Sequence, residues 1–235
     1  MLRPEGEPLW RTVAELGDFA AGRDVLEVGT GSGEALCFWA AEYGIDGTGV
    51  DTDPRSVQEA EEHARERSLG EQLQFQVAPL DDLPFRDGSF DAAVGAAAIG
   101  QLASPLAGIT ELVRVVRVGG TVILLQWAWA PDISPPKRAL VRHTLGPSAR
   151  SLEEWKRHLA AQGVRELTLH TVRDVRVDVP REALRARLGA LPHTRKLRAW
   201  GRFAGMIRRE REARRLLAGG NVLGVTLIKG TRWPS

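Results

Sequence analysis

Short apolar runs alternate with stretches of helical periodicity along the first half of the chain. Strand-length apolar runs fall at 24–29, 46–51, 73–78, 90–95 and 121–128. Helical spacing fills the segments around them, at 9–20, 33–43, 54–69 and 105–117, where Val118-Gly119-Gly120 is expected to end the last helix. Strands that alternate with helices predict an α/β fold with a parallel sheet and right-handed crossovers. The ligand of such a sheet lies beyond the carboxyl ends of its strands.

The pattern becomes less regular after Trp129. Four prolines between 130 and 150 predict a loop with a short helix near 137–144. Ser151 and Glu154 have capping-box spacing and predict a helix to about 162 that Gly163 ends. The remaining predicted elements are a strand at 165–179, helices at 180–190 and 195–218, and a last strand at 221–229.

The stretch 24–36 is the most informative one, because an apolar run ends there in glycines at alternate positions. Gly29, Gly31 and Gly33 predict a strand, a tight turn and the start of a helix, where free N–H groups face a ligand. Asp51 follows about 20 residues later at the end of the next apolar run, as an acid that binds ribose hydroxyls does. The spacing does not fit the dinucleotide fingerprint G-x-G-x-x-G. Glu27, two residues before the first glycine, suits a cationic ligand, and a glycine turn without a ligand is the alternative.

Four segments, in order and at family spacing, resemble the class I S-adenosylmethionine-dependent methyltransferases, in particular the ubiquinone/menaquinone methyltransferase-like group. They are VLEVGTGSG (25–33), TGVDTDPRSVQEAEEHA (48–64), LDDLPFRDGSFDAAV (80–94) and ELVRVVRVGGTVILL (111–125). The resemblance implies a Rossmann-like fold with a mostly parallel seven-stranded sheet and helices on both faces. It also implies S-adenosyl-L-methionine as the cofactor.

The resemblance assigns cofactor-binding positions across the first half. Glu27 is expected near the methionine end of the cofactor, and Asp51 on the ribose, with Asp53 as the competing acid and expected helix N-cap. The full set of expected cofactor residues is Glu27, Gly29, Thr30, Gly31, Gly33, Asp51, Thr52, Leu80, Asp81 and Gly95. Pro79 stands where the family has an aspartate beside the adenine; the Leu80 N–H can still approach the ring, and Asp81 is the replacement if the loop is reshaped.

Composition sets the broad class. With 235 residues and 43% hydrophobic residues, a single methyltransferase domain is expected, with a cofactor-binding core at 20–130 and a substrate-side elaboration at 130–220. The one cysteine, Cys37, is expected to be a buried reduced thiol, and no residue cluster has metal-ligand spacing. The sequence shows neither a signal-peptide core nor an 18-residue apolar run, so a cytoplasmic protein without a membrane span is expected.

Charge is unevenly distributed between the two parts of the chain. Residues 1–135 carry 9 Lys and Arg against 22 Asp and Glu, whereas residues 136–235 carry 23 against 8. The basic density is highest at 195–215, where apolar residues recur at helical spacing. An amphipathic helix with a solvated basic face is the simplest interpretation. A patch for an anionic substrate or a peripheral lipid contact, and a nucleic-acid footprint, are the alternatives.

The expected reaction is methyl transfer to a small-molecule acceptor, either anionic or apolar. The sulfonium is the electrophile, so alignment of the acceptor is the main task of the protein. A hydroxyl or carbon acid also needs a general base, for which His143 and His193 are the candidates, although an ordinary surface or hydrogen-bonded histidine is the favoured interpretation of each. Trp127 and Trp129, placed in a loop after the fifth strand, either wall the acceptor site or pack in the core. The alternatives are a nucleic-acid methyltransferase, which we consider unlikely, and a family member that binds the cofactor without transferring methyl.

Overall fold

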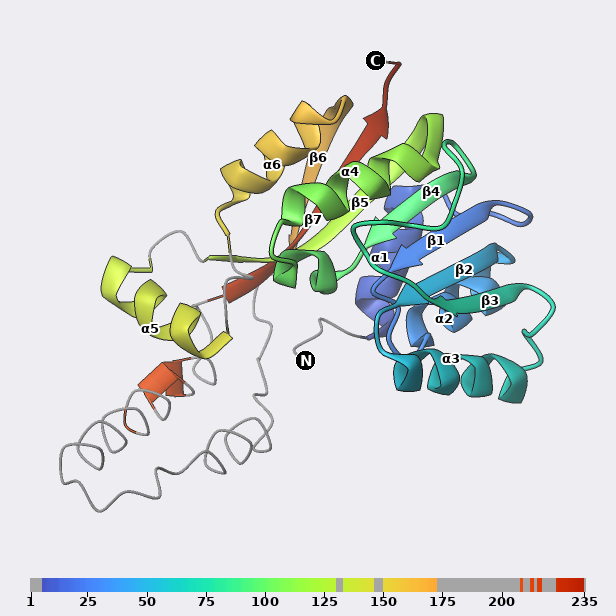
Figure 1. Cartoon of the computed structure of the whole chain (residues 1–235), viewed down its shortest axis with the longest axis horizontal. Coiled ribbons are helices and arrows are strands. Elements are labelled where there is room, and N and C mark those ends of the chain that lie inside the picture. Colours follow the sequence, from blue (N-terminus) through green and yellow to red (C-terminus); the bar gives the residue numbers. More distant parts are fainter. Residues whose placement is uncertain are drawn as a thin grey trace.

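A seven-stranded sheet forms the centre of the part of the chain that the structure describes (Figure 1). The computed structural model describes residues 6–129, 133–145, 150–172 and 223–234, together with Arg208, Glu212, Ala213, Arg215 and Leu216. The strands are β1 (Asp24–Val28), β2 (Asp46–Asp51), β3 (Leu73–Val77), β4 (Phe90–Gly95), β5 (Val116–Trp129), β6 (Val164–Val172) and β7 (Leu223–Arg232). Their order is β3-β2-β1-β4-β5-β7-β6, and β7 runs antiparallel to both of its neighbours. The expected mostly parallel seven-stranded sheet is confirmed.

Helices cover both faces of the sheet. One face carries α1 (Glu7–Gly17), α2 (Glu34–Tyr43) and α3 (Pro54–Glu66), and the other carries α4 (Pro105–Val115) and α6 (Leu152–Ala161) (Figure 1). The short 3₁₀ helix η1 (Ala97–Gln101) follows β4, and α5 (Pro135–Leu145) follows β5. Successive side chains of a strand point to opposite faces, so Val25 joins the core beneath α1 and α2, whereas Leu26 joins the core beneath α4.

Hydrogen bonds join the carboxyl ends of the parallel strands to one another. The N–H groups of Gly29 and Thr30, just after β1, both donate to the carbonyl of Val50 in β2, at 2.8 and 3.0 Å. The N–H of Ala96, just after β4, donates to the carbonyl of Val28 at 3.0 Å. The three turns that follow β1, β2 and β4 therefore meet at one edge of the sheet.

The boundary between α4 and β5 differs from the prediction in a way that the glycines explain. The helix expected at 105–117 ends at Val115, and the glycines expected to terminate it lie inside β5, where the pairing with β4 shifts register. Gly119 has φ +78°, and a Cβ on Gly120 would lie 2.6 Å from the carbonyl oxygen of Asp91, so both glycines serve an irregular strand start. The helices predicted at 180–190 and 195–218, and residues 173–179 of the predicted strand, fall mainly or wholly outside the described residues.

The expected buried thiol is confirmed. Cys37 on α2 is 1% exposed, and its burial raises the pKa of the thiol. None of the helices in the described ranges is long and apolar enough to cross a bilayer. No group of three or more potential metal ligands occurs among the described residues either.

Arg114 on α4 anchors the loop that links β3 to β4. Its guanidinium donates to the carbonyls of Leu83 and Phe85, at 3.0 and 2.7 Å, and to the carboxylates of Glu111 and Asp87, at 2.7 and 2.8 Å. Glu111 in turn accepts the N–H of Leu83 at 2.8 Å. The hydrogen bond from Arg114 lowers the pKa of Glu111. The pair thus fixes the loop that begins at the predicted adenine-binding residues.

We predict that Arg114→Met lowers the free energy of unfolding by about 2–3 kcal/mol, because it leaves the half-buried Glu111 and two loop carbonyls without their main donor. A carboxylate with a lowered pKa stabilises the fold above its unfolded pKa, and this contribution is lost as the pH falls through the lowered value. The difference in the free energy of unfolding between the wild-type protein and Arg114→Met should therefore become smaller below about pH 4.5. Denaturant unfolding at several pH values measures it.

Arg117→Met is the matched control. Arg117 forms an ion pair with Asp91 while its side chain is 53% exposed, so its loss should cost about 0–1 kcal/mol. An equal loss of stability in both variants would contradict a specific role for Arg114 in the loop.

Candidate functional site

The glycine turn after β1 is required by close packing as well as by backbone conformation. Gly29 has φ +85°, and a Cβ there would lie 2.6 Å from the Cβ of Ala98. Gly33, the N-cap of α2, has φ +73°, and a Cβ there would lie 2.8 Å from Ala60 and 2.9 Å from the ring of Phe75. Two of the predicted glycines are therefore explained by the approach of η1, α3 and β3 to the turn, which is compatible with a ligand but does not require one.

Asp51 at the end of β2 holds this turn from the side. Its Oδ2 accepts the N–H of Gly31 at 2.9 Å, and its Oδ1 accepts the N–H of Asp53 at 3.1 Å. Asp51 is only 6% exposed, and a carboxylate can accept more than two hydrogen bonds. Asp53 instead caps α3 by accepting the N–H of Arg55 at 3.0 Å, as predicted. The two acids therefore have different structural roles.

His63 on α3 supports the same turn and was not anticipated from the sequence. Its Nδ1 lies 2.9 Å from the carbonyl oxygen of Ser32. Because a carbonyl can only accept, Nδ1 carries the hydrogen in this contact. No sequence signal singled this histidine out, since His63 lies in a polar helix and 31 positions away from its partner.

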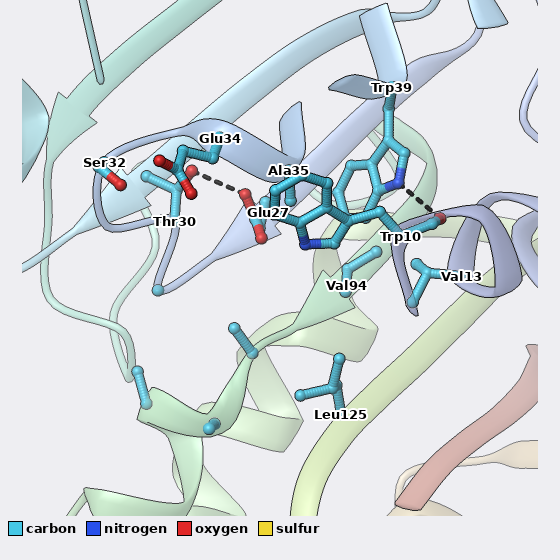
Figure 2. Close-up of a pocket in the computed structure, with 14 residues that line it drawn as sticks. Trp10, Val13, Glu27, Thr30, Ser32, Glu34, Ala35, Trp39, Val94 and Leu125 are labelled. Atoms are coloured by element: carbon cyan, nitrogen blue, oxygen red, sulfur yellow. Dashed lines mark hydrogen bonds between the residues drawn. The ribbon is translucent and has the colours of Figure 1, made fainter. Parts of the chain in front are cut away.

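A cavity opens beside the turn, between α1, α2 and the ends of β1, β4 and β5 (Figure 2). Its volume is about 580 Å³ including the open mouth. The polar lining residues are Glu27, Thr30, Ser32 and Glu34. The apolar lining residues are Trp10, Val13, Gly29, Ala35, Trp39, Val94, Ala96, Ala97, Ala98 and Leu125. Figure 2 shows the polar group gathered around the glycine turn, with Val94, Leu125 and Val13 on the opposite side.

The polar end of the cavity carries negative charge. Glu27 is 6% exposed and accepts a hydrogen bond from the hydroxyl of Thr30 at 2.7 Å. Glu34 lines the same end, and the described lining contains no lysine or arginine. Two carboxylates facing one small cavity favour a ligand with a positively charged group.

Two tryptophans form the aromatic wall, and they are not Trp127 and Trp129, for which the sequence left an acceptor wall and core packing as alternatives. The indole N–H of Trp39 on α2 donates to the backbone carbonyl of Trp10 on α1 at 2.9 Å, which docks α1 over the cavity. Trp127 and Trp129 do not line the cavity: they lie within β5, paired with β7, rather than in a loop. Trp127 is 4% exposed in the core, because β5 continues through 126–129 instead of ending before them.

Of the expected cofactor residues, Glu27, Gly29 and Thr30 line this cavity, and the others lie outside its lining. Thr52 and Asp81 are exposed, and Leu80 is buried in the core with 3% exposure. Gly31, Gly33 and Asp51 form the turn beside the cavity. A Cβ on Gly95 would lie 2.6 Å from Ile99 and 2.8 Å from Leu112, so this glycine permits packing against α4.

The two candidate bases gain no support. His143 belongs to α5, but its side chain is not among those described, and His193 lies outside the described residues. The sequence interpretation missed the lining roles of Val13, Glu34 and Leu125. For Glu34 a signal existed, because it is the first residue of the helix that the glycine turn opens.

Comparisons with known proteins find both similar sequences and similar folds. Residues 26–124 match the family model described as a methyltransferase domain. A ubiquinone/menaquinone biosynthesis C-methyltransferase from Geobacter sp. (strain M21) is 31% identical over 123 residues, which cover 51% of this chain and 52% of the relative. An ajmaline N-methyltransferase from Rauvolfia serpentina is 32% identical over 118 residues, which cover 50% and 40%. The chain thus matches about half of the length of these curated relatives.

The solved structures extend the likeness to the whole fold. The [4+2]-cyclase SpnF superposes with a TM-score of 0.73 at 23% identity, covering 97% of this chain and 81% of that one. At this level of identity the match establishes the fold, and function has to be argued from the site.

We predict that Gly29→Ala lowers the free energy of unfolding by about 2–4 kcal/mol, because it adds overpacking against Ala98 to the strain of a positive φ. Gly22→Ala is the matched control: Gly22 has φ +74° with no atom within 4 Å of the added Cβ. The control should lose about 1 kcal/mol in chemical denaturation. Equal losses would show that η1 does not constrain the turn.

Proposed function

We propose that this chain is a class I S-adenosylmethionine-dependent methyltransferase and that it transfers a methyl group from S-adenosyl-L-methionine to a small apolar acceptor. The match of residues 26–124 to a methyltransferase-domain model supports the first part. The observation that carries the proposal is the cavity beside the glycine turn, which is acidic at one end and apolar at the other. The chain matches only about half of the length of the curated relatives, so the substrates and partners of those relatives are not assigned to this chain.

The residues present fit the cofactor. Asp51 is buried beside the glycine turn, where its carboxylate accepts two backbone N–H groups, and a carboxylate at this position is the type of group that binds ribose hydroxyls. Glu27, preset by Thr30, suits the ammonium group of the methionine part. The assignments of Thr52, Leu80 and Asp81 to the adenine side, and of Gly95 to the space beside the cofactor, remain predictions from the family pattern.

The cavity favours an apolar acceptor over an anionic one. An anionic group would meet Glu27 and Glu34 with no cation in the described lining, whereas the end formed by Val13, Val94 and Leu125 suits an apolar body. A nucleic acid would face the same repulsion within the cavity. A peripheral contact through 195–215 and a cytoplasmic location stay predictions from the sequence, as does the division of the chain into 20–130 and 130–220.

The sulfonium of the bound cofactor supplies an electrophilic methyl group. The chain itself orients the acceptor between the aromatic wall of Trp10 and Trp39 and an apolar floor formed by residues 96–98. Alignment of the acceptor is the main contribution of the protein to the rate. A hydroxyl or carbon-acid acceptor also needs a general base, for which His143 and His193 stay predictions from the sequence. An amine acceptor in its neutral form needs no such base before transfer.

Cofactor binding should depend on Asp51. We predict that Asp51→Ala weakens S-adenosylmethionine binding about 100-fold in calorimetry, because two hydrogen bonds to a charged acceptor are lost. Asp53→Ala is the matched control, with a loss of about 1 kcal/mol of stability from the missing N-cap and little change in affinity. Undetectable binding to the wild-type protein, or the reverse ranking of the two variants, would refute the site assignment.

The acceptor class can be tested by transfer of a radiolabelled methyl group. We expect turnover with 1,4-naphthohydroquinone or N-methyloctylamine as apolar probes. Phosphoethanolamine and a mixed-sequence RNA, which carry anionic groups into an acidic cavity, should give at least about tenfold less product. Preferential methylation of the RNA at physiological salt would favour a nucleic-acid methyltransferase. Tight cofactor binding without transfer to any probe would favour a family member that does not methylate.

A further inference from the structure

Gln126 in β5 is a buried polar residue among apolar neighbours. It is 0% exposed, and it lies between Leu125 and Trp127, both of which are buried. Its side-chain Nε2 donates to the backbone carbonyl of Ala96 at 2.9 Å, whereas its buried Oε1 has no hydrogen-bond partner among the residues that the structure describes. Because an unpartnered buried oxygen destabilises a fold, the retention of an amide here points to a role other than stability.

The partner of Gln126 is the residue that begins the floor of the cavity. Ala96 lies between β4 and η1, and its carbonyl also accepts the N–H of Ile99 at 3.1 Å. Its own N–H donates to Val28 in β1 at 3.0 Å. Ala96, Ala97 and Ala98 line the cavity, but Gln126 does not. The amide therefore acts on the cavity through the Ala96 carbonyl, which it holds together with Ile99.

We infer that Gln126 is a positioning residue that fixes the β4–η1 corner and thereby the apolar floor of the acceptor cavity. The inference rests on the proposed function, since it assigns the floor to the site of methyl transfer. With both lone pairs of its carbonyl occupied, Ala96 presents no free acceptor to the cavity. A displacement of about 1 Å in such a floor is enough to impair alignment.

The donor is what distinguishes glutamine from its closest analogues. Methionine has a similar shape without either polar group, so Gln126→Met removes the donor together with the unpartnered oxygen. The Ala96 carbonyl keeps Ile99 as a partner, and the melting temperature should stay equal or rise. Glutamate is isosteric, but its carboxylate cannot donate to a carbonyl. Burial raises the pKa of an introduced acid, and the protonated form regains the donor.

The test measures amide hydrogen exchange over 96–101, the melting temperature and the affinity for S-adenosylmethionine. For Gln126→Met we expect exchange at 96–101 about tenfold faster than in the wild type and cofactor binding about tenfold weaker, with no loss in melting temperature. For Gln126→Glu we compare the variant with the wild type at the same pH. At about pH 8.5 we expect exchange at 96–101 to be faster than in the wild type, and at about pH 6 we expect it to be close to the wild-type rate.

Thr226→Val is the matched control. Thr226 is 2% exposed and pairs with Gln126 across β5 and β7, so it tests the loss of a buried polar group in the neighbouring strand. It should leave exchange at 96–101 unchanged. The inference is overturned if Gln126→Met lowers the melting temperature without affecting exchange at 96–101, if Thr226→Val has the same effect on exchange, or if exchange in Gln126→Glu does not depend on pH. Failure of the wild-type protein to bind the cofactor would refute the proposed function, and the exchange measurements would still decide the role of Gln126.

Discussion

The site depends on the hydrogen bonds that join the turn after β1 to the end of β2. Parallel pairing brings the carboxyl ends of these strands to one edge, and the Val50 carbonyl and the Asp51 carboxylate then bind the N–H groups of Gly29, Thr30 and Gly31. Without them the first backbone groups after β1 would be unpaired at a buried edge. The same contacts place Glu27 and Thr30 at the acidic end of the cavity.

The cavity combines parts with opposite physical requirements. Its acidic end keeps Glu27 nearly buried, where the hydroxyl of Thr30 donates a hydrogen bond to the carboxylate. Its apolar end is shaped by helix packing: Trp39 fixes Trp10 through a hydrogen bond from α2 to α1, and η1 supplies alanines that leave space. Under the proposed function, the acidic end holds the positively charged methyl donor and the apolar end holds the uncharged acceptor.

Stability and function are balanced differently at neighbouring positions. Gly29 and Gly33 are fixed by packing against Ala98 and Ala60, so the turn would require glycine even without a ligand. Gln126 shows the reverse, because the fold retains a buried oxygen without a partner there. A glycine motif is therefore weaker support for ligand binding than a polar group that the fold has no structural reason to bury.

The sequence by itself determined the order of strands and helices in the first half, the N-cap at Asp53, the capping box at Ser151 and the location of the site at the glycine turn. These features depend on local periodicity and on residues close together in the chain. Tertiary structure alone decided that Trp10 and Trp39, rather than Trp127 and Trp129, form the aromatic wall, that Glu34 joins Glu27, and that Gln126 holds Ala96. Those facts depend on how far β5 extends and on how α1 docks against α2, and such long-range packing leaves no periodic signal in one sequence.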